Sequence, residues 1–183
     1  AEVRSEPSPR VVEPDAGAHR TDAAYLKQLM VYGWLLRAGI ALILHWTGYS
    51  RLLAPDEATY ENAGRGLAQY WTGVLFMPPE RFLANEAHGY FYVNAVSFYL
   101  FGAASLPMKL LNAAMGVLVT RHVFLLALEL FGSPVARRAG FLCNYFPSLI
   151  LWSAVNIRDI WVILLLVLVS RYSLTVVRGY SHT

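Results

Sequence analysis

Long apolar runs alternate with polar segments along this chain, and the lengths of these runs predict membrane-spanning helices. A bilayer core of about 30 Å requires about 20 apolar residues in a helix. Four runs approach this length: residues 29–46, 110–130, 141–155 and 160–169. The last of them reaches it if the helix continues past Ser170 towards Val177. The pattern therefore predicts an all-α membrane protein with about four transmembrane helices.

The beginning of the chain has a different character. It is polar and contains Pro7, Pro9 and Pro14, and a segment of this kind cannot bury enough apolar surface to fold. We therefore expect residues 1–22 to form a disordered cytoplasmic tail, followed by a transmembrane module at residues 23–183. The tail lacks the apolar stretch and cleavage site of a secretory signal peptide. Because the chain starts at Ala1, we expect an uncleaved end from which the initiator methionine was removed.

Two further helical patterns lie between the first two apolar runs. Asp56 is placed as an N-cap, Glu57 occupies the first turn, and apolar residues then recur at helical spacing. This pattern predicts an amphipathic helix at the membrane surface. Residues 89–101 are uncharged and aromatic, but too few to span comfortably, so we expect a second interfacial or re-entrant helix. A fifth span is the alternative, and it would reverse the side of every later segment.

Composition supports a membrane location and limits the possible partners. Hydrophobic residues make up 56% of the chain and charged residues 15%, which is more apolar than a soluble domain of this size can bury. The net charge is only +3 and the basic residues are dispersed, so we expect no nucleic-acid partner. The single cysteine, Cys143, falls inside a predicted span, where we expect it in the core. It permits neither a disulfide framework nor a cysteine metal site.

The basic residues also predict the orientation in the membrane. Short cytoplasmic segments are enriched in Lys and Arg, and such residues occur before the first span, between the second and third, and after the fourth: Arg4, Arg10, Arg20, Lys27, Arg137, Arg138, Arg171 and Arg178. With four spans, these segments share one side, so both termini are expected to be cytoplasmic. Arg37 and Arg121 fall within apolar runs, where an unpaired cation is costly. Each should snorkel, face a neighbouring helix or mark the end of a span, and we expect snorkelling for Arg121.

Acidic and basic positions recur in the predicted outer loops, where each begins or directly precedes a hydrophobic helix: Asp56, Glu57, Glu86 with His88, and Asp159 after Arg158. Carboxylates gathered at one membrane face can act as a general base or hold a divalent cation near a phosphate leaving group. An arginine there can pair with the phosphate. The alternative is structural: Asp56 as a helix cap, Glu57 as a partner of the helix dipole, and the Arg158-Asp159 pair as a hydrated turn.

The order of these motifs resembles the GT-C superfamily of polytopic glycosyltransferases, in particular its protein mannosyltransferase and aminoarabinose transferase group. Residues 55–60, followed by a surface helix, resemble the first-loop acidic motif of that superfamily. The similarity continues through Gly89-Tyr90-Phe91-Tyr92, Leu100-Phe101-Gly102, Leu106-Pro107, Leu111-Asn112-Ala113, Leu130-Phe131-Gly132, Phe146-Pro147-Ser148 and Asn156-Ile157-Arg158-Asp159. The order and spacing of these motifs, more than any single one, carry the resemblance.

This resemblance implies transfer of a sugar from a polyprenyl-phosphate donor to a lipid, protein or glycan acceptor at the outer face of a bacterial inner membrane. It implies catalytic roles for Asp56, Glu57, Glu86 and Asp159, substrate binding by His88, Arg158 and Tyr60, and a divalent metal ion held by Asp56 and Glu86. Some relatives have a basic residue and a proline directly after the second acidic position. Here Ala87-His88 follows Glu86, so His88 would take over the phosphate contact.

Members of that superfamily have many more spans than the four expected here. We therefore expect an N-terminal fragment, one part of a split enzyme, or a non-catalytic structural subunit of a larger membrane complex. The expected partners are membrane lipid, the donor and other membrane protein subunits. Orientation of two substrates contributes several kcal/mol of barrier lowering, and four helices with an open flank do not enclose them. We accordingly expect the chain alone to transfer no sugar.

Overall fold

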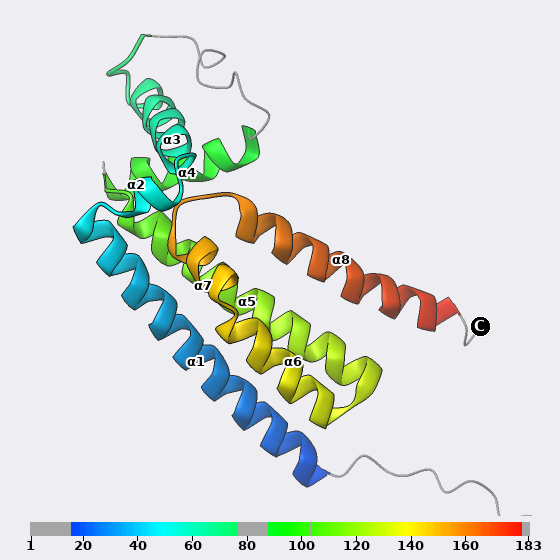
Figure 1. The fold of residues 1–183 in the computed structure, drawn as a ribbon. Coiled ribbons are helices and arrows are strands. Elements are labelled where there is room, and N and C mark those ends of the chain that lie inside the picture. The colour runs from blue at the N-terminus through cyan, green and yellow to red at the C-terminus, as the bar shows by residue number, and fades with distance from the viewer. Residues whose placement is uncertain (1–15, 77–87, 103, 181–183) are drawn as a thin grey trace, which may run out of the picture.

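The structure, a computed structural model, describes residues 16–76, 88–102 and 104–180, and every regular element in these ranges is a helix (Figure 1). The helices are α1 (Ala16–Thr47), α2 (Ser50–Leu53), α3 (Glu57–Trp71), α4 (His88–Phe101), α5 (Leu106–Phe131), α6 (Ser133–Tyr145), α7 (Pro147–Ala154) and α8 (Asp159–Tyr180). The all-α fold class is therefore confirmed. Helix α1 begins at Ala16 and takes in residues 16–22, which the sequence analysis assigned to the tail.

Within the described part of the chain, three helices are long and apolar enough to cross a membrane, over Arg20–Thr47, Leu106–Phe131 and Asp159–Val177. The predicted span at residues 141–155 is instead divided between α6 and α7. Phe146 separates them with an extended backbone, φ −67° and ψ 120°. A residue before proline is driven into this conformation, and Pro147 has no N–H to continue the hydrogen bonding of α6.

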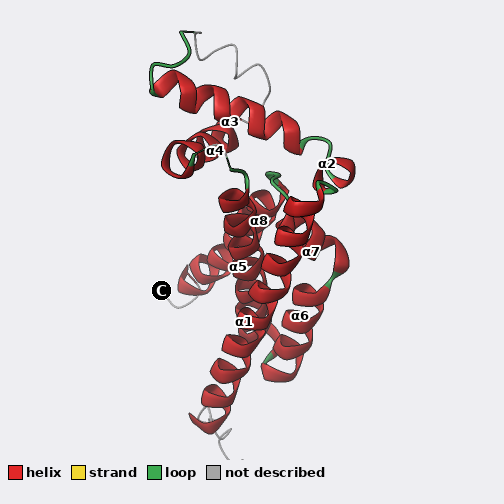
Figure 2. Ribbon diagram, turned by 90° about the vertical axis from the view of Figure 1, so that its left-hand side faces the viewer, coloured by secondary structure: helices red, strands yellow, loops and turns green. Residues whose placement is uncertain are grey.

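The helices form a bundle with a cap across one end. Helix α5 packs against α1, α6, α7 and α8, and α3 packs mainly against α4. Figure 2 shows α3 and α4 lying across the end of the bundle. Helix α4 has 14 residues, about 21 Å at 1.5 Å per residue, which is shorter than a bilayer core. Its length and placement agree with an interfacial helix and not with a fifth span.

Ion pairs identify which segments share the other end. The carboxylate of Asp22 in α1 lies 2.8 Å from the guanidinium of Arg137 in α6, and Glu129 in α5 lies 2.8 Å from Arg171 in α8. The start of α1, the α5–α6 turn and the last part of α8 therefore share the end opposite α3 and α4 (Figure 1). Among the described residues, Arg137 and Arg171 thus lie towards the same end of the bundle.

Arg37 faces neighbouring helices, one of the three outcomes expected for it. Its side chain is only 1% exposed, and its Nε donates to Ser153 Oγ of α7 at 3.0 Å. Its Nη1 donates to Asn144 Oδ1 of α6 at 3.0 Å and to its own helix at Gly33 O. Arg121, for which we expected snorkelling, is half-buried. The guanidinium of Arg37 therefore joins α1 to both halves of the broken span.

Gly116 of α5 allows Arg37 and Ser153 to lie close to its backbone. We predict that a larger side chain at this position destabilises the fold. A Cβ at Gly116 would lie 2.7 Å from Ser153 Cβ and 2.9 Å from Arg37 Nε, whereas a Cβ at Gly39 would meet nothing within 4 Å. Gly116→Ala should lower the free energy of unfolding by about 1–3 kcal/mol through overpacking. Gly39→Ala should be neutral or slightly stabilising. Denaturation of both variants in detergent, followed by circular dichroism, measures the difference, and equal effects would contradict the packing.

The arrangement of the ends also predicts sidedness. In a variant lacking the native Cys143, single cysteines replacing Ala23, Thr59 and Thr175 test it, since all three positions are exposed. We expect a membrane-impermeant maleimide to label the cysteine at position 59 from outside the cell, and the other two only after permeabilisation. Labelling at positions 23 and 59 from the same side would refute this topology.

Candidate functional site

The adjacent carboxylates Asp56 and Glu57 point into opposite environments. Asp56 is exposed, whereas Glu57 is 0% exposed. Asp56 occupies the predicted N-cap position of α3, but its side chain makes no capping hydrogen bond and its backbone is already helical, φ −66° and ψ −18°. A capping residue normally has an extended backbone that turns its side chain back over the first turn. Asp56 is thus left available at the surface.

Glu57 forms a buried ion pair. Its Oε1 lies 2.9 Å from Lys109 Nζ in the first turn of α5, and Lys109 is itself 1% exposed. Lys109 Nζ also donates to Ser50 Oγ of α2 at 2.9 Å. Sequence reasoning missed Lys109. The available signal was a cation at a helix N-terminus, where the dipole disfavours it and a carboxylate partner is therefore to be expected.

The same carboxylate connects the two loops at this end. The backbone N–H of Asn156, between α7 and α8, donates to Glu57 Oε1 at 3.0 Å. The side chain of Asn156 accepts from Tyr90 OH at 2.6 Å and donates to Asn94 Oδ1 at 2.7 Å, both in α4. Burial raises the pKa of the Tyr90 phenol well above its usual value, so Tyr90 stays a neutral donor. Helices α3 and α4 are thereby tied to the α7–α8 turn.

Asn112 of α5 holds that turn from the inside. Its Nδ2 donates to the backbone oxygens of Val155 at 2.7 Å and Ile157 at 3.0 Å. Its Oδ1 accepts from Trp161 Nε1 of α8 at 2.8 Å. A single buried amide thus satisfies backbone groups that the break between two helices leaves without partners. Asn112 belongs to one of the family motifs, but the sequence assigned it no role.

Exposed charges from two loops influence the pKa of Tyr60. Burial raises the pKa of this phenol, the charge of Arg158 lowers it, and the charges of Asp56 and Asp159 raise it further. The hydrogen bond from Asn156 to Glu57 brings the loop of Asp56 and Tyr60 beside the turn of Arg158 and Asp159. The Tyr60 ring packs edge-on against Tyr90, with 5.1 Å between the ring centroids, so it is held against the buried network. Asp56, Arg158 and Asp159 are all exposed.

The remaining predicted site residues divide into two groups. Glu86 and the side chain of His88 lie outside the described residues. Glu57 is described, but it faces Lys109 and not solvent. Among the residues whose placement is described, no group of three or more His, Cys, Asp or Glu could hold a metal ion. Asp56 with Glu86 as metal ligands therefore stays a prediction. What this end of the molecule presents chemically is a cation beside two carboxylates and a phenol.

The fold and this end define the class of the molecule as an all-helical membrane protein with charged loops converging on one face. A family model described as dolichyl-phosphate-mannose-protein mannosyltransferase matches residues 85–182, which is more than half of the 183 residues. The chain belongs to this family. The resemblance drawn from the motifs is thereby confirmed. Comparisons with curated proteins and with solved structures found no match.

The matched region includes only part of the candidate site. It contains α4 to α8, and with them Asn112, Arg158 and Asp159, but it begins after Asp56 and Glu57. The family match therefore does not include the first acidic loop. The assignment of this loop to the site is supported by its contacts with the matched region. Chief among these are the hydrogen bond from Asn156 and the ion pair with Lys109.

The buried pair predicts a strongly asymmetric mutational effect. Lys109→Met leaves the Glu57 carboxylate buried without a cation, and we expect a loss of about 3–5 kcal/mol in unfolding free energy. The double variant Glu57→Gln with Lys109→Met should recover most of it, because no charge remains to be buried. Arg51, 73% exposed and 4.0 Å from Glu61, provides the control, since Arg51→Gln should cost at most about 1 kcal/mol. Equal losses for Lys109→Met and Arg51→Gln would contradict the buried pair.

Proposed function

We propose that this chain forms the outer-face acidic module of a membrane glycosyltransferase that takes its sugar from a polyprenyl-phosphate donor. The observation that carries the proposal is the hydrogen bond from the backbone N–H of Asn156 to Glu57 Oε1, which brings the exposed Asp56 beside the turn that carries Arg158 and Asp159. Membership of a mannosyltransferase family supports sugar transfer as the class of reaction. The acceptor is a lipid, a protein or a glycan that reaches the same membrane face.

Each exposed group has a role that follows from its chemistry. Arg158 offers a planar fork of N–H donors that suits a phosphate leaving group. Asp56, exposed and without a capping bond, is the general base that takes the proton from an acceptor hydroxyl. Tyr60 keeps its proton, because burial raises its pKa, and it serves as a hydrogen-bond donor to the sugar or the phosphate.

The residues behind this surface act by positioning. Glu57 accepts from the backbone N–H of Asn156, two residues before Arg158, so it fixes the turn that presents the phosphate-binding cation. Its predicted catalytic role becomes a positioning role in this proposal. Asp56 and Asp159 supply carboxylate oxygens that suit a hard divalent cation. They are too few to coordinate one alone, so such an ion would share its coordination with Glu86, the donor phosphate or water.

In the cell, we place the module in a bacterial inner membrane, with both termini cytoplasmic and α3 and α4 at the outer face. Donor and acceptor need a walled cavity, and further helices from the same gene or from partner subunits would complete it. The competing hypothesis is a non-catalytic subunit of a larger membrane complex, in which the same acidic end is retained without turnover. A charge-specific loss of activity separates the two.

Asp56→Asn provides that separation, because it keeps the shape of the side chain and removes the base. Introduced into the native gene and assayed in membranes with a labelled polyprenyl-phosphate sugar, it should lower transfer by about 10²-fold or more. The assembled protein should remain at its normal level, since Asp56 is exposed. The purified 183-residue chain should transfer no sugar.

Glu129→Gln, at the opposite end of the bundle, is the matched control and should retain near-normal activity. Unchanged transfer by the Asp56→Asn protein would favour the structural subunit. Transfer by the isolated chain would show that no further helices are needed.

A further inference from the structure

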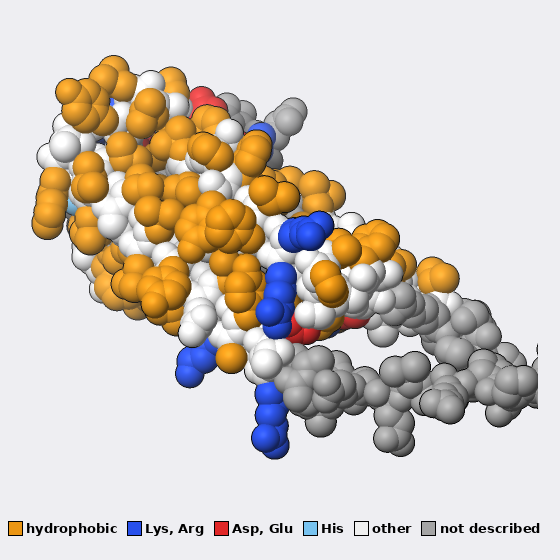
Figure 3. Space-filling model, turned by 60° about the horizontal axis from the view of Figure 1, so that its bottom comes forward, with side chains coloured by type: hydrophobic (Ala, Val, Ile, Leu, Met, Phe, Trp, Pro, Cys, Tyr) orange, Lys and Arg blue, Asp and Glu red, His pale blue; other side chains and the backbone are white. Residues whose placement is uncertain are grey.

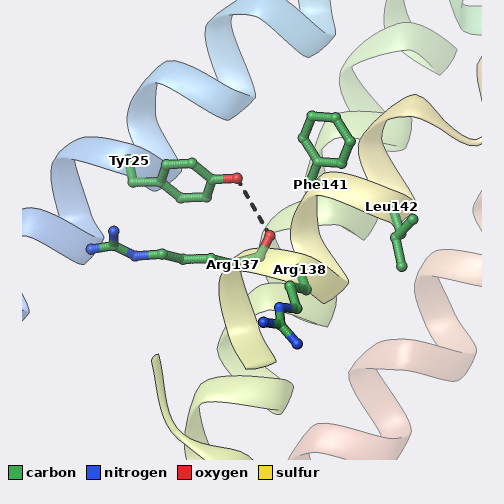
Figure 4. A pocket seen from close by; sticks show the side chains of 5 residues that line it. All are labelled: Tyr25, Arg137, Arg138, Phe141 and Leu142. Carbon is green, nitrogen blue, oxygen red and sulfur yellow. Dashed lines mark hydrogen bonds between the residues drawn. The ribbon is translucent and has the colours of Figure 1, made fainter. Parts of the chain in front are cut away.

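The basic end of the bundle contains a pocket that plays no part in the proposed chemistry. It measures about 430 Å³ and lies between α1 and α6, lined by Tyr25, Arg137, Arg138, Phe141 and Leu142 (Figure 4). The candidate site is formed at the starts of α3 and α8, which lie towards the other end of the bundle (Figure 1). The pocket therefore requires a separate explanation.

One wall of the pocket is held firmly in place. Arg137 pairs with the buried carboxylate of Asp22 at 2.8 Å, and its guanidinium lies over the Tyr25 ring, 5.4 Å from the centroid. The Tyr25 hydroxyl donates to the backbone oxygen of Arg137 at 3.4 Å. The guanidinium of Arg137 is thus paired within the protein. Its side chain and the Tyr25 ring form a fixed wall of the pocket.

Arg138 differs from its neighbour. It is exposed, and the described part of the chain gives it no ion-pair partner. Figure 4 shows its side chain directed away from Arg137 and Tyr25. Phe141 and Leu142 follow one turn later on α6, about 5 Å further from the basic end. The pocket therefore combines an available cation nearer the end with an exposed apolar surface nearer the centre of the bundle.

The surroundings of the pocket have a surplus of positive charge. The described carboxylates of this end, Asp22 and Glu129, are engaged with Arg137 and Arg171. Arg20 and Lys27 on α1 are exposed, as Arg138 is on α6. Figure 3 shows Lys and Arg side chains gathered at this end beside a broad hydrophobic surface. The local charge attracts anions, and the adjoining surface is suited to hydrocarbon.

We propose that this pocket binds an anionic phospholipid of the membrane leaflet at the basic end, with the lipid phosphate on Arg138 and an acyl chain along Phe141 and Leu142. Basic pockets between transmembrane helices at the cytoplasmic side are suited to anionic headgroups. The apolar walls distinguish a lipid from a soluble anion, which would leave Phe141 and Leu142 in contact with water. The assignment is independent of the proposed sugar transfer, since it uses none of the same residues.

The test measures lipid affinity of the purified chain by native mass spectrometry, with dioleoyl phosphatidylglycerol as the anionic probe and dioleoyl phosphatidylcholine as the zwitterionic one. The chain should prefer phosphatidylglycerol. Arg138→Gln should weaken phosphatidylglycerol binding about tenfold, the value of one charge-assisted hydrogen bond, and leave phosphatidylcholine binding unchanged. Arg138→Lys should keep most of the preference, and Phe141→Ser should weaken binding of both lipids.

Arg20→Gln is the matched control, because it removes an exposed cation of the same end that does not line the pocket. It should change affinity less than twofold. Equal binding of the two lipids by the unmodified chain, or equal losses for Arg20→Gln and Arg138→Gln, would overturn the site. Displacement of the lipid by inorganic phosphate alone would assign the pocket to a soluble anion and overturn it too. Unchanged circular dichroism confirms that each variant is folded, and if Arg138→Gln is not, the Arg138→Lys and Phe141→Ser results decide.

Discussion

The arrangement of the end of the bundle that carries α3 and α4 depends on the ion pair between Glu57 and Lys109. Two charges are withdrawn from water there, at a cost of several kcal/mol each, which mutual attraction offsets only when hydrogen bonds complete the site. Ser50 and the backbone of Asn156 supply those bonds to the two partners. The second carboxylate oxygen, Glu57 Oε2, accepts none from the described residues. The pair thus joins α2, α3, α5 and the α7–α8 turn in one buried contact.

Helix α5 carries polar side chains that contact other helices at both ends of the bundle. Its first turn carries Lys109, its second carries Asn112, and its last carries Glu129, which pairs with α8 at the basic end. Polar side chains on one helix therefore engage partners at both ends, and between them Val119 packs in an apolar cluster with Ile160 and Leu164.

The lengths of the apolar runs in the sequence correctly predicted most of the long helices. The sequence did not predict which side chains of a helix face the protein interior. The first, second and fourth spans followed from the lengths of their apolar runs, and residues 89–101 were recognised as too short. The third span was misjudged because hydropathy continues through Phe146-Pro147 while the backbone does not. Convergence of Asp56 and Asp159 was expected from loop position alone. Which member of the Asp56-Glu57 pair faces inward depends on a lysine far along the chain, and no local pattern contains that information.

The buried guanidinium of Arg37 bears on how the protein is made. Its side-chain acceptors Asn144 and Ser153 lie 107 and 116 residues further along the chain, so α1 is synthesised long before either of them exists. A lone arginine near the centre of a helix raises the cost of insertion by about 2.5–3.5 kcal/mol, which the apolar remainder of α1 has to offset. Until α6 and α7 arrive, the newly inserted helix carries an incompletely bonded cation in hydrocarbon. Hydrogen bonds to that cation favour a specific docking of α6 and α7 on α1. Apolar surfaces alone provide no such driving force between helices in lipid.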